Sequence, residues 1–120
     1  MIPARFRTAV HVGDDLDTLI DFYEQALGCT LRFRDADRWA EMNAGDGRLA
    51  LASPAEAPAG MRHGAVSVFQ VADLDGLVDR VRAAGGQLLD VRDMGGHGRV
   101  ATLLDPCGTA FQALQPAAAA

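Results

Sequence analysis

The sequence has little cysteine and no lysine. Its two cysteines, Cys29 and Cys107, lie far apart and match no zinc-binding or redox spacing, whereas small secreted domains usually carry several paired cysteines. We therefore expect a reduced, cytoplasmic setting. All 11 basic side chains are arginines, so a phosphate-binding loop that ends in Lys-Ser or Lys-Thr is excluded. No serine stands in a Gly-x-Ser-x-Gly turn, which excludes the nucleophile of that hydrolase class.

Long apolar runs and excess positive charge are also missing. No stretch approaches the roughly 18 apolar residues of a membrane span, and the first residues do not look like a targeting signal. The net charge of −5 argues against nucleic acid or an anionic membrane as a partner. With 120 residues, 49% of them hydrophobic, we expect one domain over residues 1–116. The alanine-rich tail at 117–120 is expected to be disordered.

Two segments of the chain match at a constant offset of 58 residues. The tripeptide Asp15-Leu16-Asp17 recurs as Asp73-Leu74-Asp75, and further pairs follow in the same register. These pairs are Leu19 with Leu77, Ile20 with Val78, Tyr23 with Val81, Ala26 with Ala84, Gly28 with Gly86 and Leu31 with Leu89. The agreement indicates an internal duplication. The alternative is that two amphipathic helices with an Asp cap and a Gly stop look alike by themselves.

Each copy predicts one strand, one helix and three further strands. Apolar residues recur at helical spacing after Asp15 and Asp73, which can cap the helices, and glycines at 28 and at 85 or 86 can end them. Strands are expected at 6–12, 30–34, 38–42, 48–52, 65–71, 87–91, 99–104 and 110–114. The predicted fold is therefore α+β. Two βαβββ modules, at about 5–53 and 63–115 with a linker at about 54–62, would form curved sheets around a cleft.

The motifs in both halves resemble those of the vicinal-oxygen-chelate superfamily, the group of glyoxalases, bleomycin-resistance proteins and extradiol dioxygenases. Residues 15–28 are similar to its D-L-x5-F-Y-x3-L-G signature. Residues 71–73, 83–86 and 105–108 are similar to its V-x-D, A-x-G-G and D-P-x-G elements, with Cys107 standing where a polar residue is usual. The resemblance implies the fold more specifically than the activity. It also implies a homodimer, in which the two chains often exchange modules.

The resemblance places four possible metal ligands, one from the first and one from the last strand of each module. Metal-dependent relatives carry His, Glu or Gln at these positions. Here the positions are Thr8, Ala50, Val66 and Gln112. Only the Gln112 amide is an ordinary ligand, so we expect no metal and no other cofactor. One alternative remains open, an unconventional set made of His11, Glu41, His63 and His97.

Without a metal, the cleft is expected to be largely apolar. Trp39 could stack on a flat ligand, or it could fill a gap in the core. Arg38 or Arg99 could neutralise an acidic group of a ligand, or could be solvated. His97 could close over a ligand from its glycine-rich loop, or lie on the surface. The expected ligand contacts are Thr8, Val10, Trp39, Ala50, Val66, Val68, His97, Arg99 and Gln112, with Ala110 beside them.

These residues favour a binding protein over an enzyme. The first hypothesis is sequestration of a hydrophobic or aromatic small molecule, as in bleomycin resistance and thus antibiotic resistance. The second is a glyoxalase-, isomerase- or dioxygenase-like enzyme, in which Glu41 or His97 could act as acid or base; its catalytic residues are otherwise unknown. The third is a subunit or regulatory partner in a larger pathway.

Overall fold

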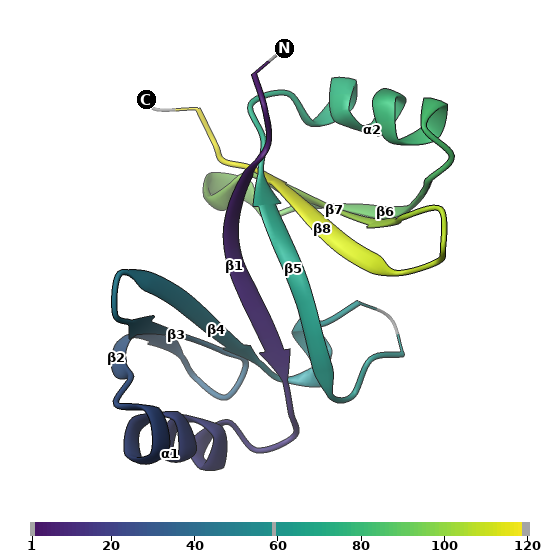
Figure 1. Ribbon diagram of the computed structural model, residues 1–120. Coiled ribbons are helices and arrows are strands. Elements are labelled where there is room, and N and C mark those ends of the chain that lie inside the picture. Colours follow the sequence, from purple (N-terminus) through teal and green to yellow (C-terminus); the bar gives the residue numbers. More distant parts are fainter. Residues whose placement is uncertain (1, 59, 119–120) are drawn as a thin grey trace. The chain divides into compact units, whose positions relative to one another are not determined.

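The structure is a computed structural model that describes residues 2–58 and 60–118. Two helices and eight strands follow one another in the order that the duplication predicts, so the α+β class with two βαβββ modules is confirmed (Figure 1). The first module contains β1 (Arg5–Val12), α1 (Leu16–Leu27), β2 (Thr30–Asp35), β3 (Trp39–Ala44) and β4 (Gly47–Ala52). The second contains β5 (Gly64–Gln70), α2 (Leu74–Ala83), β6 (Gln87–Asp93), β7 (Arg99–Leu104) and β8 (Ala110–Gln115). Residues 119–120 of the expected disordered tail lie outside the described residues.

The chain divides into two compact units. The first unit holds residues 8–66, and the second holds residues 2–7 and 67–118. The strand order is β2-β3-β4-β1 in the first unit and β5-β8-β7-β6 in the second. In each unit the module's first strand runs parallel to its last strand, and the other neighbours are antiparallel. Neither helix in the described part of the chain is long and apolar enough to cross a membrane.

The pairing registers support the duplication beyond the helices. Val10 is the partner of Ala50, and Val68, 58 positions later than Val10, is the partner of Gln112. Each edge strand is interrupted by an irregularity near its start, between residues 31 and 33 in β2 and between residues 88 and 90 in β6. A β-bulge is a local feature that unrelated strands share only by coincidence. The two halves therefore repeat one structural plan, and Ala50 and Gln112 are equivalent positions.

Both helices begin where the sequence predicts. The carboxylate of Asp15 accepts hydrogen bonds from the hydroxyl of Thr18 at 2.8 Å and from its amide at 3.2 Å, and Asp73 accepts one from the amide of Gly76 at 3.0 Å. The Thr18 hydroxyl, with its amide, lowers the pKa of Asp15, because hydrogen bonds stabilise the ionised carboxylate. At the end of α1, Gly28 takes a left-handed φ of 70° that glycine adopts without strain.

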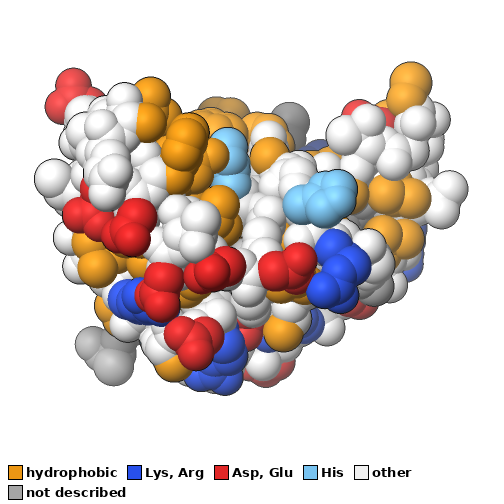
Figure 2. All heavy atoms as spheres, turned by 90° about the horizontal axis from the view of Figure 1, so that it is seen from below, with side chains coloured by type: hydrophobic (Ala, Val, Ile, Leu, Met, Phe, Trp, Pro, Cys, Tyr) orange, Lys and Arg blue, Asp and Glu red, His pale blue; other side chains and the backbone are white. Residues whose placement is uncertain are grey.

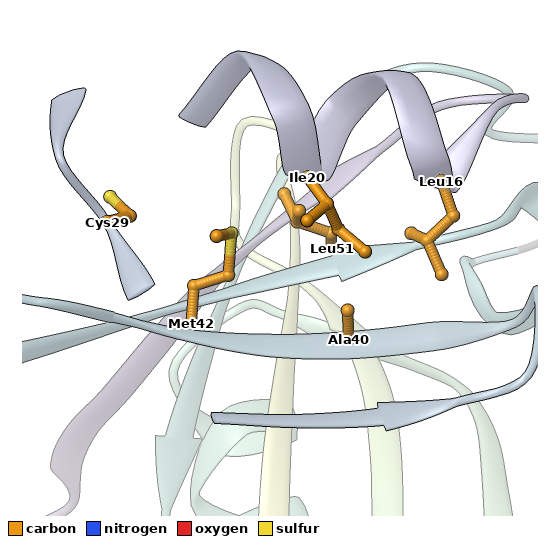
Figure 3. Packing of buried hydrophobic residues seen from close by; sticks show 6 residues of the cluster. All are labelled: Leu16, Ile20, Cys29, Ala40, Met42 and Leu51. Atoms are coloured by element: carbon orange, nitrogen blue, oxygen red, sulfur yellow. The ribbon is translucent and has the colours of Figure 1, made fainter. Parts of the chain in front are cut away.

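Each helix covers one face of the sheet in its own unit. In the first unit, Leu16 and Ile20 of α1 pack on Ala40, Met42 and Leu51 of the sheet (Figure 3). In the second unit, the corresponding buried cluster is Val71, Leu74, Val78, Ala101, Leu103 and Ala113. Because side chains alternate along a strand, the residues between these point to the opposite side. We call that side of each sheet the open face.

Substitution of Leu51 by alanine should lower the free energy of unfolding by about 2–5 kcal/mol, since a buried leucine leaves a cavity under α1. Leu51 is 0% exposed, whereas Leu27 of α1 is 66% exposed. The matched control Leu27→Ala should change the free energy by about 0.5 kcal/mol or less. Urea unfolding measures both. Equal losses in the two variants would contradict the packing described.

Candidate functional site

The open face of the first unit combines small buried side chains with a tryptophan and a carboxylate. Val10, Ala50 and Ala52 form its floor and are buried. On β3, Trp39 is the cross-strand partner of Ala52, and Glu41 is the partner of Ala50. The face also carries Thr8, Val12, Asn43 and Arg48. Directly opposed side chains on one face lie about 5 Å apart at their Cβ atoms, so Trp39 and Glu41 stand beside the small floor residues.

Phe33 joins this face although the sequence did not predict it. It is the partner of Glu41 on the side away from β4, and it is 53% exposed. Leu31, two residues earlier, pairs with buried Met42 of the helix-covered face. The bulge between Leu31 and Phe33 shifts the alternation by one residue, so a strict period of two would place Phe33 on the wrong face.

Glu41 has no partner in the described residues. Its side chain is partly buried, and neither an ion pair nor a hydrogen bond to a described residue involves its carboxylate. No arginine in the described residues therefore neutralises Glu41. Arg38, which could have met an acidic ligand, instead forms an ion pair with Asp35 at 3.1 Å.

The open face of the second unit carries a polar residue, Gln112, at the position where the first unit carries Ala50. Gln112 of β8 is the partner of Val68 and of Thr102, and its Nε2 donates a hydrogen bond to the Thr102 hydroxyl at 3.2 Å. Ala110 lies on the same face, opposite Leu104. Thr102 stands in β7 where Glu41 stands in β3, next to the equivalent position of the last strand. Gln112 and Thr102 thus hydrogen bond to each other across the two strands.

The predicted ligand contacts do not all reach an open face. Thr8, Val10, Trp39 and Ala50 come together in the first unit, where Val66 lies at the end of the unit, buried, and Val68 and Gln112 come together in the second. Arg99 lies on the helix-covered side, where its Nη1 contacts Asp75 of α2 at 3.3 Å. The alternation explains this position, since Arg99 is two residues from buried Ala101.

The three histidines and Glu41 do not assemble into a metal-binding group. His11 faces α1, with its Nδ1 2.8 Å from the hydroxyl of Tyr23. His63 is exposed just before β5, and His97 is exposed in a 3₁₀ turn at Gly95–His97. No group of three or more His, Cys, Asp or Glu side chains within residues 2–58 and 60–118 is arranged so that it could hold a metal ion.

Comparison with known proteins decides the family. The sequence profile of the Glyoxalase/Bleomycin resistance protein/Dioxygenase superfamily matches residues 6–113. The chain belongs to this superfamily. An uncharacterized protein of Mycolicibacterium smegmatis is 34% identical to this chain over 104 residues, which are 86% of each of the two proteins. A Mycobacterium tuberculosis protein provisionally named a glyoxylase is 32% identical over 108 residues, which are 87% of this chain and 41% of that protein.

Several solved structures share the fold of this chain. Methylmalonyl-CoA epimerase of Mycobacterium tuberculosis has a TM-score of 0.73 at 20% identity, over 95% of this chain and 89% of that chain. The Streptomyces coelicolor epimerase in complex with 2-nitronate-propionyl-CoA has a TM-score of 0.73 at 21% identity, over 95% and 98%. A superfamily member from Vibrio splendidus has a TM-score of 0.67 at 18% identity, over 94% and 99%. Identities this low support the fold and leave the chemistry to the residues of this chain.

The donors at the four family positions do not fit a divalent ion. Ala50 and Val66 offer only hydrocarbon. The Thr8 hydroxyl lies 3.0 Å from the carbonyl oxygen of Arg48 and 3.1 Å from that of Ala9, so its proton is directed to the backbone. Gln112 keeps one amide oxygen, because its nitrogen donates to Thr102. One neutral oxygen and a hydroxyl fall short of the three or more nitrogen or anionic oxygen ligands that such sites use.

Purified protein should therefore contain well under one equivalent of nickel, zinc, iron, cobalt or manganese. Treatment with EDTA should leave its melting temperature unchanged, because no ion contributes to the folded state. Elemental analysis and thermal unfolding measure the two quantities, with Gln112→Ala as the variant that removes the best remaining donor. A stoichiometric ion that is lost in Gln112→Ala would show that this position does hold a metal.

Proposed function

We propose that this superfamily member binds a small, mainly apolar or aromatic molecule on the open face of its sheets without a metal ion. The observation that supports the proposal is the pair of accessible aromatic side chains, Trp39 and Phe33, above a buried floor of small apolar residues in the first unit. Small apolar side chains next to a large aromatic ring suit a flat hydrocarbon-rich ligand. Sequestration of such a molecule, as in bleomycin resistance, is then sufficient for function. A homodimer would provide two equivalent sites.

The size of the hydrophobic term is adequate for this role. Removal of about 150 Å² of apolar surface from water contributes roughly 4 kcal/mol at about 25 cal/mol per Å². Offset stacking on an indole ring adds about 0.5–1.5 kcal/mol. The free-energy cost of immobilising the ligand offsets part of both terms. The stacking on Trp39 is then a measurable fraction of the remaining binding free energy.

A thermal-shift screen of uncharged aromatic compounds should give ligands that raise the melting temperature equally with and without EDTA. At a free concentration of 100 times the dissociation constant, the stabilisation should be about 2.7 kcal/mol. For such a ligand, Trp39→Ala should weaken binding by about tenfold, as expected from lost stacking and burial. Calorimetric titration provides the dissociation constants.

Phe22→Ala is the matched control for this loss. Phe22 lies on α1, is 55% exposed and forms an edge-to-face contact with Tyr23. Its removal should leave the ligand affinity unchanged, because α1 covers the opposite side of the sheet. If Phe22→Ala weakened binding as much as Trp39→Ala, the ligand would not be on the open face.

A second candidate function is proton abstraction from a carbon acid. Glu41 supports it, because a partly buried carboxylate without a partner can accept a proton from a ligand placed over Ala50. The structural likeness to methylmalonyl-CoA epimerases gives the test compound. In this case the chain would be an isomerase-like enzyme that uses its own carboxylate.

If Glu41 is such a base, methylmalonyl-CoA incubated with the protein in D₂O should exchange the hydrogen on the carbon between its two carbonyl groups. Glu41→Gln should slow this exchange by about 100-fold or more, since general-base catalysis typically contributes that factor. Proton NMR follows the reaction, and Glu24→Gln on the exposed side of α1 is the control. Exchange that is unaffected by Glu41→Gln would exclude Glu41 as the base.

A further inference from the structure

The charge on the open face of the first unit is unbalanced at Glu41. Most arginines of this unit are held by other acids. Arg34 contacts Asp17 at 2.6 Å and Asp37 at 3.1 Å, Arg38 contacts Asp35 at 3.1 Å, and Arg62 contacts Asp14 at 2.9 Å. Acidic and basic side chains accordingly lie among one another on the face drawn in Figure 2. Glu41 is the acid of this sheet face that stays without a cation among the described residues.

Arg48 is the basic residue that could have neutralised Glu41. It lies on β4 opposite Asn43. It is on the open face, two residues before Ala50, which is the partner of Glu41. It is exposed and forms no ion pair with a described residue. Its guanidinium therefore remains in water, while the carboxylate of Glu41 is partly withdrawn from it. A cationic group on a ligand would offset the free-energy cost of this partly buried, unpaired carboxylate. Such a ligand would therefore bind more tightly.

Two aromatic residues are neighbours of Glu41 in the strand register of the open face. Phe33 is its direct cross-strand partner, and Trp39 lies two residues before it on the same face of β3. The faces of aromatic rings attract cations, tryptophan most strongly, and more so when the cation is partly desolvated. Aromatic rings that surround a negative charge recognise organic ammonium groups, whose methylene or methyl groups contact the rings while the charge faces the carboxylate.

From this juxtaposition we infer that the first unit's open face binds an organic monocation, an amine or quaternary ammonium that carries an apolar or aromatic group. The inference rests on the proposed binding function and adds the charge of the ligand to it. The ammonium group lies at Glu41 between Phe33 and Trp39, and the apolar part packs against the accessible surfaces of these two rings. An anionic ligand is disfavoured at this position, because it would be repelled by the unpaired carboxylate.

A pair of probes with the same shape and different charge tests the inference. Benzyltrimethylammonium is the cation, and neopentylbenzene is its neutral isostere, in which carbon replaces nitrogen. The protein should bind the cation about tenfold more tightly than the isostere, as expected for a carboxylate and two rings that each contribute modestly. Calorimetric or competition titration in the same buffer measures both constants.

Two variants with the same change in net charge locate the effect. Glu41→Gln should reduce the preference for the cation to about twofold or less, while the affinity for neopentylbenzene stays the same. Glu24→Gln should keep the full preference for the cation. Glu24 is exposed on α1, which covers the other side of the sheet, and salt screens its charge from the open face. Equal melting temperatures of the variants without ligand show that both are folded.

The outcomes separate the charge of the ligand from the binding function. Equal affinity for the two probes, or a preference that survives Glu41→Gln, would overturn the inference and leave apolar binding intact. A preference lost equally in Glu24→Gln would overturn it as well, since the effect would then come from net charge alone. Failure of benzyltrimethylammonium to bind also overturns it. If neutral aromatic compounds in the thermal-shift screen fail too, the proposed binding function falls with it.

Discussion

The two-residue period of the β-strand determines which side chains of each sheet pack against a helix and which face away from it. Along β4, Leu51 turns toward α1, and its neighbours Ala50 and Ala52 turn the other way. A single helix covers only one side of a sheet, so every residue that stabilises the hydrophobic contact with the helix leaves a neighbour available on the opposite side. The side chains that pack against the helix and those that face away from it are therefore separate sets on the same strands. The core can be conserved in character while the open face changes its chemistry.

The sequence could predict most of the fold because its signals are local. Asp15, Asp73 and Gly28 mark helix ends by hydrogen bonding and by left-handed geometry, and the repeated segment locates the second helix from the first. The family resemblance already matched Ala50 to Gln112. Phe33 could not be placed, because a bulge changes which side a residue faces without an unmistakable mark in the sequence.

Side-chain partners were the least predictable part of the site. Arg99 could equally have pointed to a ligand, and only the position of Asp75 on α2 shows that it binds the helix instead. Glu41 forms no ion pair with a described residue, although Arg34 and Arg38 precede it closely in sequence, because these two arginines reach Asp17, Asp35 and Asp37 instead. Such choices depend on which long side chains meet across strands and helices, and a list of residues does not contain that distance information.

The duplicated halves differ at two structurally equivalent positions of their sheets. Gln112 and Thr102 hydrogen bond to each other in the second unit, whereas Glu41, beside Ala50 in the first, has no partner for its carboxylate among residues 2–58 and 60–118. The chain's only tryptophan lies beside that carboxylate. Indole emission from this protein consequently originates at one place, so its colour and quenching report the polarity of that sheet face without any attached dye.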